Sequence, residues 1–369
     1  MTKLPDAMTD AELRPIASKV YEGRPINGPD ALRLLATCSI ADLGRLASHV
    51  RRGLHGDAAY YGVSMNLNFT NICELRCPLC AFARDEGQPG AYLLTQTDME
   101  RRIKKAAAAG VDEVHIVGGL HPDLSLSYFE ELLSSVKRLA PRMFITAFTA
   151  VEIDYFARKE GVSTEEALAR LIKAGLGAMP GGGAEIFAPR VRKVIAPKKI
   201  SGTRWLEIMR MAHEAGLKTN ATMLYNHIEK PADIVDHLSR LRSLQAETGG
   251  FKAFVPLAYH DGNTAVKARR RVPTGFDELR LYATARVFLH NIPHIKALWM
   301  YVGEKMAQLL LNFGVDDFSG TYSGERVVHA AGAATADRGS ETYLRALIEN
   351  AGFRPVRVNA SYERTGRRA

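Results

Sequence analysis

Short apolar runs alternate with longer amphipathic segments from residue 62 almost to the end of the chain. The runs are typical of buried strands, and the segments between them repeat apolar side chains every three to four residues, as helices do. Strands are predicted at residues 62–70, 113–119, 143–148, 176–180, 218–225, 252–258 and 294–299, with a weaker strand–helix pair near 302–318. Helices are predicted at 95–110, 125–140, 203–216, 231–247 and 277–290, with a further one beginning at Ser163.

Two of these helices carry capping signals at their starts. Thr97 and Glu100 have the spacing of a capping box, in which each side chain bonds the backbone of the other residue. Ser163 has Glu166 three residues later, in the same arrangement. The residues before 56 read as short helices punctuated by proline and glycine.

The regular alternation of strands and helices predicts right-handed βαβ units and a parallel sheet. Six clear units and two weaker ones predict an α/β protein with a TIM-type (β/α) barrel, complete or nearly so. We expect residues 1–58 to form an N-terminal helical cap, 59–320 the barrel, and 321–369 an extension that completes or covers it.

Composition indicates the cellular compartment in which this barrel folds. The 369 residues are 46% hydrophobic, which is enough for one large core, and four cysteines are too few for a disulfide framework. The chain begins with a charged segment and has no uncharged apolar run of about 18 residues. We therefore expect a cytoplasmic protein in a reducing compartment, with no membrane partner.

The net charge of +9 leaves two interpretations open. The basic residues are mostly dispersed along amphipathic helices, but they gather within 190–199 and again within 267–271. Each group is either a solvated face or a site for small anions. The dispersal argues against a nucleic-acid partner.

Three of the four cysteines, Cys73, Cys77 and Cys80, follow the first predicted strand in the spacing C-x3-C-x2-C. A structural zinc site would need a fourth protein ligand, and the nearest histidines in sequence are the distant His55 and His115. A four-iron cluster held by three thiolates would instead leave one iron open to a small molecule. Cys38 lies in an apolar segment and is predicted to be a buried structural cysteine.

This motif after the first strand of a parallel barrel resembles that of the radical S-adenosylmethionine (SAM) enzymes. The resemblance implies a [4Fe–4S] cluster with one open iron, held by the three cysteines, and SAM bound to that iron. It also implies an electron donor such as flavodoxin or ferredoxin. One departure is Leu79, since the residue before the last cysteine is commonly aromatic in that family.

The same resemblance implies residues that bind SAM. Gly118 and Gly119 match the segment whose carbonyls hold the methionine amine, although a tight turn would also explain them. Glu185 matches the carboxylate that binds the ribose hydroxyls, or else is a carboxylate favoured at a helix start. Tyr225 lies where the family packs the adenine, and Arg204 is a candidate for the methionine carboxylate.

Longer segments resemble the menaquinone futalosine-pathway branch of the family. GGLHPD (118–123) and FTAVEI (148–153) are similar to its aminofutalosine synthases rather than to the sister cyclases or to deazaflavin synthase. This implies that the 5′-deoxyadenosyl radical adds to the double bond of 3-[(1-carboxyvinyl)oxy]benzoate, so that SAM is consumed as a substrate.

Residues after the predicted strands supply candidates for the chemistry, since catalytic groups of such barrels lie at the carboxyl ends of the strands. The candidate catalytic residues are His121, Glu152 and His260. The candidate substrate-binding residues are Asn68, Thr149 and Arg192, and Lys198 and Lys199 are further cations that could pair with a substrate carboxylate.

Two interpretations from other classes remain open at this stage. One is a zinc-containing nucleic-acid-binding protein, which the charge and the cysteine cluster would allow. The other is a structural subunit that has lost its activity, against which the intact cysteines count.

Overall fold

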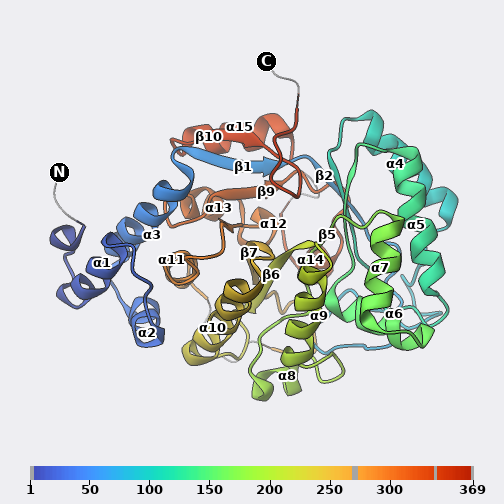
Figure 1. Cartoon of the computed structure of the whole chain (residues 1–369), viewed down its shortest axis with the longest axis horizontal. Coiled ribbons are helices and arrows are strands. Elements are labelled where there is room, and N and C mark those ends of the chain that lie inside the picture. Colours follow the sequence, from blue (N-terminus) through green and yellow to red (C-terminus); the bar gives the residue numbers. More distant parts are fainter. Residues whose placement is uncertain (1–3, 268–272, 336–338, 367–369) are drawn as a thin grey trace.

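The computed structural model describes residues 4–267, 273–335 and 339–366. Its centre is a sheet of seven parallel strands whose order follows the sequence (Figure 1). These strands are β2 (Ser64–Leu67), β3 (Glu113–Ile116), β4 (Phe144–Ala147), β5 (Ala178–Met179), β6 (Lys218–Tyr225), β7 (Phe251–Ala258) and β8 (His294–Ile295). Each lies at a predicted apolar run, so the parallel α/β architecture is confirmed.

Helices follow the strands along the chain and lie on the outside of the curled sheet (Figure 1). They are α4 (Gln96–Ala108), α5 (Leu126–Leu139), α6 (Ala150–Glu160), α7 (Thr164–Ala174), α8 (Pro189–Ile195), α9 (Gly202–Glu214), α10 (Pro231–Thr248) and α11 (Gly275–Phe288). Within the described ranges, none of the helices is long and apolar enough to cross a membrane.

One prediction about these helices is wrong. The cap of α4 is Thr95, whose hydroxyl accepts from the Asp98 N–H at 3.1 Å, and not the expected Thr97. Helices α6 and α8 are additional, since no helix was predicted at either segment. The predicted cap of α7 is confirmed, since the Ser163 hydroxyl accepts from the Glu166 N–H at 3.1 Å.

The sheet curls into a nearly complete barrel, and β9 (Asp317–Gly320) lies at its seam. On one side of the seam the Ala297 N–H, just past β8, donates to the Asp317 carbonyl at 2.9 Å. On the other side the Asn66 N–H in β2 donates to the Ser323 carbonyl, also at 2.9 Å. Residues 317–323 therefore join the two edges of the seven-stranded sheet.

The C-terminal part of the chain covers the amino-terminal end of the barrel. β1 (Ala58–Gly62), which leads directly into β2, pairs in parallel with β9 and with β10 (Arg354–Arg357). Beyond β10, Tyr362 stacks on His294 at the start of β8, with ring centroids 3.5 Å apart. The remaining helices of the C-terminal part of the chain are α12 (Trp299–Val302), α13 (Glu304–Leu310), α14 (Val327–Ala330) and α15 (Glu341–Asn350).

The predicted short helices at the N-terminus are present and lie against one side of the barrel (Figure 1). They are the 3-10 turns Pro5–Ala7 and Ala11–Leu13, followed by α1 (Arg14–Tyr21), α2 (Gly28–Ala36) and α3 (Ile40–His55). Helices α2 and α3 both pack on α11. Cys38 lies in the turn between α2 and α3 and is exposed, so the prediction of a buried thiol is wrong. The neighbouring Thr37 is buried instead, where its hydroxyl donates to Asp10 at 3.0 Å.

A buried carboxylate fastens β9 to β8. Asp316 accepts hydrogen bonds from the Ile295 N–H at 2.8 Å, from His294 Nδ1 at 2.6 Å and from the buried Arg286 guanidinium. Burial opposes ionisation of Asp316, but the charge of Arg286 overcomes it and lowers the pKa of this carboxyl to about 2.

Removing the cation from this pair should be costly. Arg286→Met leaves the Asp316 charge buried without its main partner, which we expect to reduce the free energy of unfolding by about 3–5 kcal/mol. Arg210→Met is the matched control, since Arg210 pairs with Glu247 at 2.6 Å on the surface and such pairs contribute about 0.2–1 kcal/mol. Denaturant titration compares the two variants, and equal losses would contradict the proposed role of Asp316.

Candidate active site

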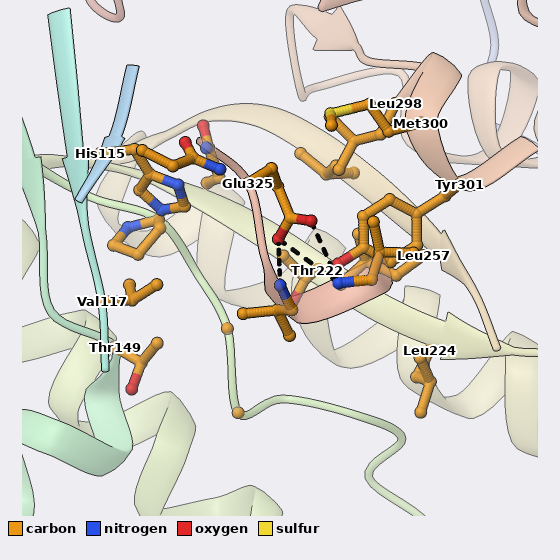
Figure 2. Close-up of a pocket in the computed structure, with 18 of the residues that line it drawn as sticks. His115, Val117, Thr149, Thr222, Leu224, Leu257, Leu298, Met300, Tyr301 and Glu325 are labelled. Atoms are coloured by element: carbon orange, nitrogen blue, oxygen red, sulfur yellow. Dashed lines mark hydrogen bonds between the residues drawn. The ribbon is translucent and has the colours of Figure 1, made fainter. Parts of the chain in front are cut away.

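The barrel encloses a cavity of about 310 Å³. One end, here called the outer end, is lined by Cys80, Glu185 and Lys199, which follow the carboxyl ends of the strands. The other, the inner end, is lined by Lys252 and Ala360 near the amino-terminal ends. Figure 2 shows His115, Val117 and Thr149 on one wall. The facing wall carries apolar and aromatic side chains, from Leu224, Leu257, Leu298, Met300 and Tyr301 (Figure 2).

The three clustered cysteines lie on the loop that leaves β2, as predicted. The Cys73 N–H donates to the Arg84 carbonyl at 3.1 Å, and the Cys80 N–H donates to the Cys77 carbonyl at 2.9 Å. Burial raises the pKa of the Cys77 thiol to about 11. A thiolate at this position therefore requires a nearby positive charge, which bound iron would supply. The loop fits a metal cluster that faces the outer end of the cavity through Cys80.

Gly118 and Gly119 hold this loop against the end of β3. A Cβ on Gly119 would lie 2.0 Å from the Ile72 carbonyl oxygen, and one on Gly118 would lie 2.7 Å from the Phe69 ring. The Gly119 N–H also donates to the Thr70 carbonyl at 2.9 Å. The glycines are therefore required for close packing, and a contact between their carbonyls and SAM stays a prediction.

Glu185 lies at the outer end of the cavity and is paired with a lysine. Lys199 Nζ donates to Glu185 Oε1 at 2.6 Å, and both side chains are buried or nearly so. Burial opposes ionisation of Glu185, but the Lys199 charge outweighs it and lowers the pKa of the carboxyl below its usual value. The carboxylate therefore stays ionised and can accept further hydrogen bonds from a ligand.

Arg192 has a different role from the one predicted. Its guanidinium is buried and hydrogen bonds to backbone carbonyl oxygens, those of Gly183, Ala184, Ile186 and Ile200. Because its donors are committed to the backbone and it does not line the cavity, Arg192 fixes the loop that carries Glu185 and is not placed to bind substrate. Of the predicted basic residues near the fourth strand end, Lys199 is the one in the cavity wall.

Arg204 and Tyr225 also lie away from the cavity. Arg204 donates to Asp154 at 2.9 Å and to the Thr164 hydroxyl at 2.6 Å, which ties α9 to α6 and α7. The Tyr225 hydroxyl lies behind β6 and donates to Glu278 at 3.5 Å. The geometry supports neither the predicted methionine-carboxylate contact nor the predicted adenine contact for these side chains.

Two of the three candidate catalytic residues, Glu152 and His121, do not line the cavity and instead bond to the backbone. Glu152 forms a capping box with Thr149, and it also accepts from the Gly118 N–H at 3.1 Å. His121 Nδ1 accepts from the Asp123 N–H at 3.1 Å. Burial raises the pKa of Glu152 to about 7, but its oxygens are already bonded to the backbone. We therefore assign Glu152 to the start of α6 and to the support of Gly118.

Three other predicted residues do line the cavity, namely Asn68, Thr149 and His260. The Asn68 amide donates to the Val117 carbonyl at 3.1 Å, while its buried oxygen has no hydrogen-bond partner among the residues that the structure describes. His260 Nε2 hydrogen bonds to the Tyr301 carbonyl at 2.9 Å. The other basic group, within residues 267–271, lies mostly outside the described residues.

A set of polar residues inside the barrel was not among the predicted site residues. They are Asn66, His115, Thr146 and Asn220, and each has a buried polar atom without a hydrogen-bond partner within the described structure. Leaving such an atom unsatisfied costs about 1–3 kcal/mol. A sequence signal for these residues was available, because each is a polar residue within a strand that is otherwise rich in apolar side chains. A polar ligand in the cavity would supply the missing hydrogen-bond partners.

The loop after β9 covers this cavity from the side. Glu325 accepts from the N–H groups of Val327 at 2.8 Å and Val328 at 3.1 Å, as drawn in Figure 2. Val327, Val328 and Ala331 contribute to the cavity wall.

Comparison with known proteins places the chain among enzymes. A model of the Radical SAM superfamily matches residues 67–241, and one of the CofH/MqnC C-terminal region matches residues 248–367. The aminodeoxyfutalosine synthase of Thermus thermophilus is 43% identical over 96% of both chains.

Relatives with two other activities are also similar. The 5-amino-6-(D-ribitylamino)uracil–L-tyrosine 4-hydroxyphenyl transferase of Methanopyrus kandleri is 38% identical over 86% of this chain and 88% of its own. The cyclic dehypoxanthine futalosine synthase of Streptomyces coelicolor is 37% identical over 96% and 89%. The crystal structure of methylornithine synthase has the same fold, with a TM-score of 0.73 at 17% identity over 92% of this chain and 97% of that one.

The cysteine assignment predicts which thiols hold iron. Cys73→Ala, Cys77→Ala or Cys80→Ala should each abolish the cluster, because each removes one of the three thiolate ligands. Iron and sulfide content and visible absorption of anaerobically purified protein provide the measurement. The exposed Cys38 is the control, and loss of iron in Cys38→Ala would contradict the assignment.

Proposed function

The chain belongs to the radical SAM superfamily, and we propose that it is an aminodeoxyfutalosine synthase. The proposed reaction transfers the adenosyl group of SAM to 3-[(1-carboxyvinyl)oxy]benzoate, with rearrangement and loss of carbon dioxide. The 43% identity to the Thermus thermophilus synthase along nearly the whole of both chains carries the proposal. The residues 118–123 and 148–153, which resemble the synthases, support it as well.

Enzymes of this superfamily use a [4Fe–4S] cluster and SAM. In this chain Cys73, Cys77 and Cys80 would hold the cluster, which leaves one iron without a protein ligand. When bound, the cluster supplies the electron that cleaves SAM to the 5′-deoxyadenosyl radical. A small electron-transfer protein such as flavodoxin or ferredoxin is the proposed source of that electron.

Residues at the outer end of the cavity would bind SAM. Glu185 is the proposed acceptor for the ribose hydroxyls, and Lys199 keeps it ionised. Arg192 holds the loop of Glu185 in place through its backbone bonds, so the carboxylate is oriented before SAM binds. A preorganised acceptor of this kind loses little entropy on binding.

The middle of the cavity suits an aromatic substrate. Its walls are apolar where Leu224, Leu257, Leu298 and Met300 meet, and such walls bind an aromatic ring while a few polar groups fix its orientation. Thr149 and His260 lie on the same cavity and are the proposed polar contacts near the vinyl carboxylate.

Family membership argues against a zinc-containing nucleic-acid-binding protein. The cyclase and the 4-hydroxyphenyl transferase stay possible outcomes of the test, since relatives with those activities are 37% and 38% identical. All three activities would use the same barrel and cofactor, so they differ in what becomes of the adenosyl group and in the substrate consumed.

Substitution of Glu185 tests the SAM site. Glu185→Gln should weaken SAM binding by about tenfold or more, because it removes charge-assisted hydrogen bonds to the ribose. Calorimetric titration of the iron-loaded protein provides the measurement, with iron content as a check. The matched control is Glu12→Gln at an exposed N-terminal site. Unchanged affinity in Glu185→Gln would remove this residue from the SAM site.

The fate of the adenosyl group tests the reaction itself. A radical that adds to a double bond leaves its carbons in the product, so ¹³C in the adenosyl group should appear in aminodeoxyfutalosine. Mass spectrometry of an anaerobic reaction with SAM, reductant and the benzoate substrate follows the label. Stoichiometric free 5′-deoxyadenosine, with turnover of dehypoxanthine futalosine instead, would assign the chain to the cyclases.

A further inference from the structure

A continuous row of polar side chains crosses three strands inside the barrel. Asn66 of β2 is the register partner of His115 in β3, and His115 is the register partner of Thr146 in β4. All three line the cavity, and in each a buried polar atom, Oδ1, Nε2 and Oγ1 respectively, has no partner among the described residues. Three neighbouring orphan groups on one wall indicate a shared polar ligand.

A lysine lies at the same end of the cavity. Three lysines line the cavity within the described part of the chain, and two of them have carboxylate partners. Lys199 is paired with Glu185 at 2.6 Å, and Lys296 is paired with Asp317 at 3.1 Å. Lys252, at the start of β7, instead donates to a neutral backbone carbonyl, that of Ala360. Burial lowers the pKa of this amine to about 7, and a bound anion would stabilise its protonated form.

The other charged groups around Lys252 permit an anion there. Asp317 is already bonded to Lys296 and to the Tyr362 hydroxyl at 2.7 Å. Glu113 also lines this end, and burial raises the pKa of its carboxyl. In its protonated form Glu113 can donate a hydrogen bond to a bound carboxylate instead of repelling it.

The two ends of the cavity determine how the proposed aromatic acid would be oriented in it. The vinyl group of the proposed substrate must meet the adenosyl group at the outer end, where Cys80 and Glu185 lie. The carboxylate on the far side of the aromatic ring then points toward the inner end, at Lys252 and the polar row. An apolar ring between the two ends matches the apolar middle of the cavity.

We propose that Lys252 and the row Asn66–His115–Thr146 form the subsite for the ring carboxylate of an aromatic acid substrate. The identity of that acid rests on the proposed function, whereas the selectivity for an aromatic carboxylate does not. Lys252 supplies the countercharge. The Thr146 hydroxyl, His115 in the tautomer with a proton on Nε2, and the Asn66 amide nitrogen can donate hydrogen bonds to the carboxylate and so fix the ring orientation. Asn220, on β6, adds a further buried amide to the same space.

The test compares an acid with its neutral isostere. Binding of 3-hydroxybenzoate and of 3-hydroxybenzamide to the iron-loaded protein is measured by calorimetry, which requires no turnover. The native protein should prefer the acid, and Lys252→Met should weaken binding of the acid by about tenfold or more while changing binding of the amide less than about threefold.

Lys218→Met is the matched control. Lys218 also begins a barrel strand and also donates to a backbone carbonyl, that of Gly249 at 3.0 Å, but it is exposed. It should leave binding of both probes unchanged. If Lys252→Met does not fold, Asn66→Asp serves instead, because a carboxylate in the row should repel the acid and spare the amide.

The outcomes separate this inference from the proposed function. Equal weakening of acid and amide in Lys252→Met, or no weakening of either, would overturn the subsite even if the adenosyl label is captured. The subsite would be supported if the native protein prefers the acid and Lys252→Met loses this preference. This holds even if the labelling experiment assigns another reaction.

Discussion

The cavity depends on closure of the barrel, and closure depends on the buried Asp316 carboxylate. Through Ile295, His294 and Arg286 this carboxylate joins the start of β9 to β8 and α11. Because β9 is held there, the residues that follow it reach β2 through Ser323. Without this seam the sheet would be open on one side, and its inner face would be exposed to water.

Close backbone packing then brings the cysteine loop to the rim of the closed barrel. Gly119 lets the Ile72 carbonyl approach the end of β3, and the Glu152 carboxylate holds the N–H of the preceding Gly118. On the opposite side Arg192 binds the backbone that carries Glu185. Glu152 and Arg192, which were expected to contact ligands, thus support the cysteine loop and the loop of Glu185, and this role explains their burial outside the cavity lining.

The candidate site could be predicted only in part from the sequence. Residues that directly follow predicted strands were expected at the carboxyl end of the barrel. Four residues chosen in this way do line the cavity, namely Asn68, Thr149, Glu185 and His260. Position along the chain does not determine side-chain direction, so it could not show that Arg204 and Tyr225 turn away. The start of helix α6 was not predicted either. Glu152 was therefore taken as a catalytic candidate, whereas in the structure its carboxylate caps that helix.

The sequence by itself determined the properties that depend on neighbours along the chain. Strand and helix periods predicted the parallel sheet, and the spacing of Cys73, Cys77 and Cys80 predicted a three-thiolate loop. Only the tertiary structure decided the inner end of the cavity. Asn66, His115, Thr146 and Lys252 are far apart in sequence, and strand register and barrel closure bring them to one space. Register and closure arise from pairings between distant segments, which local sequence patterns do not encode.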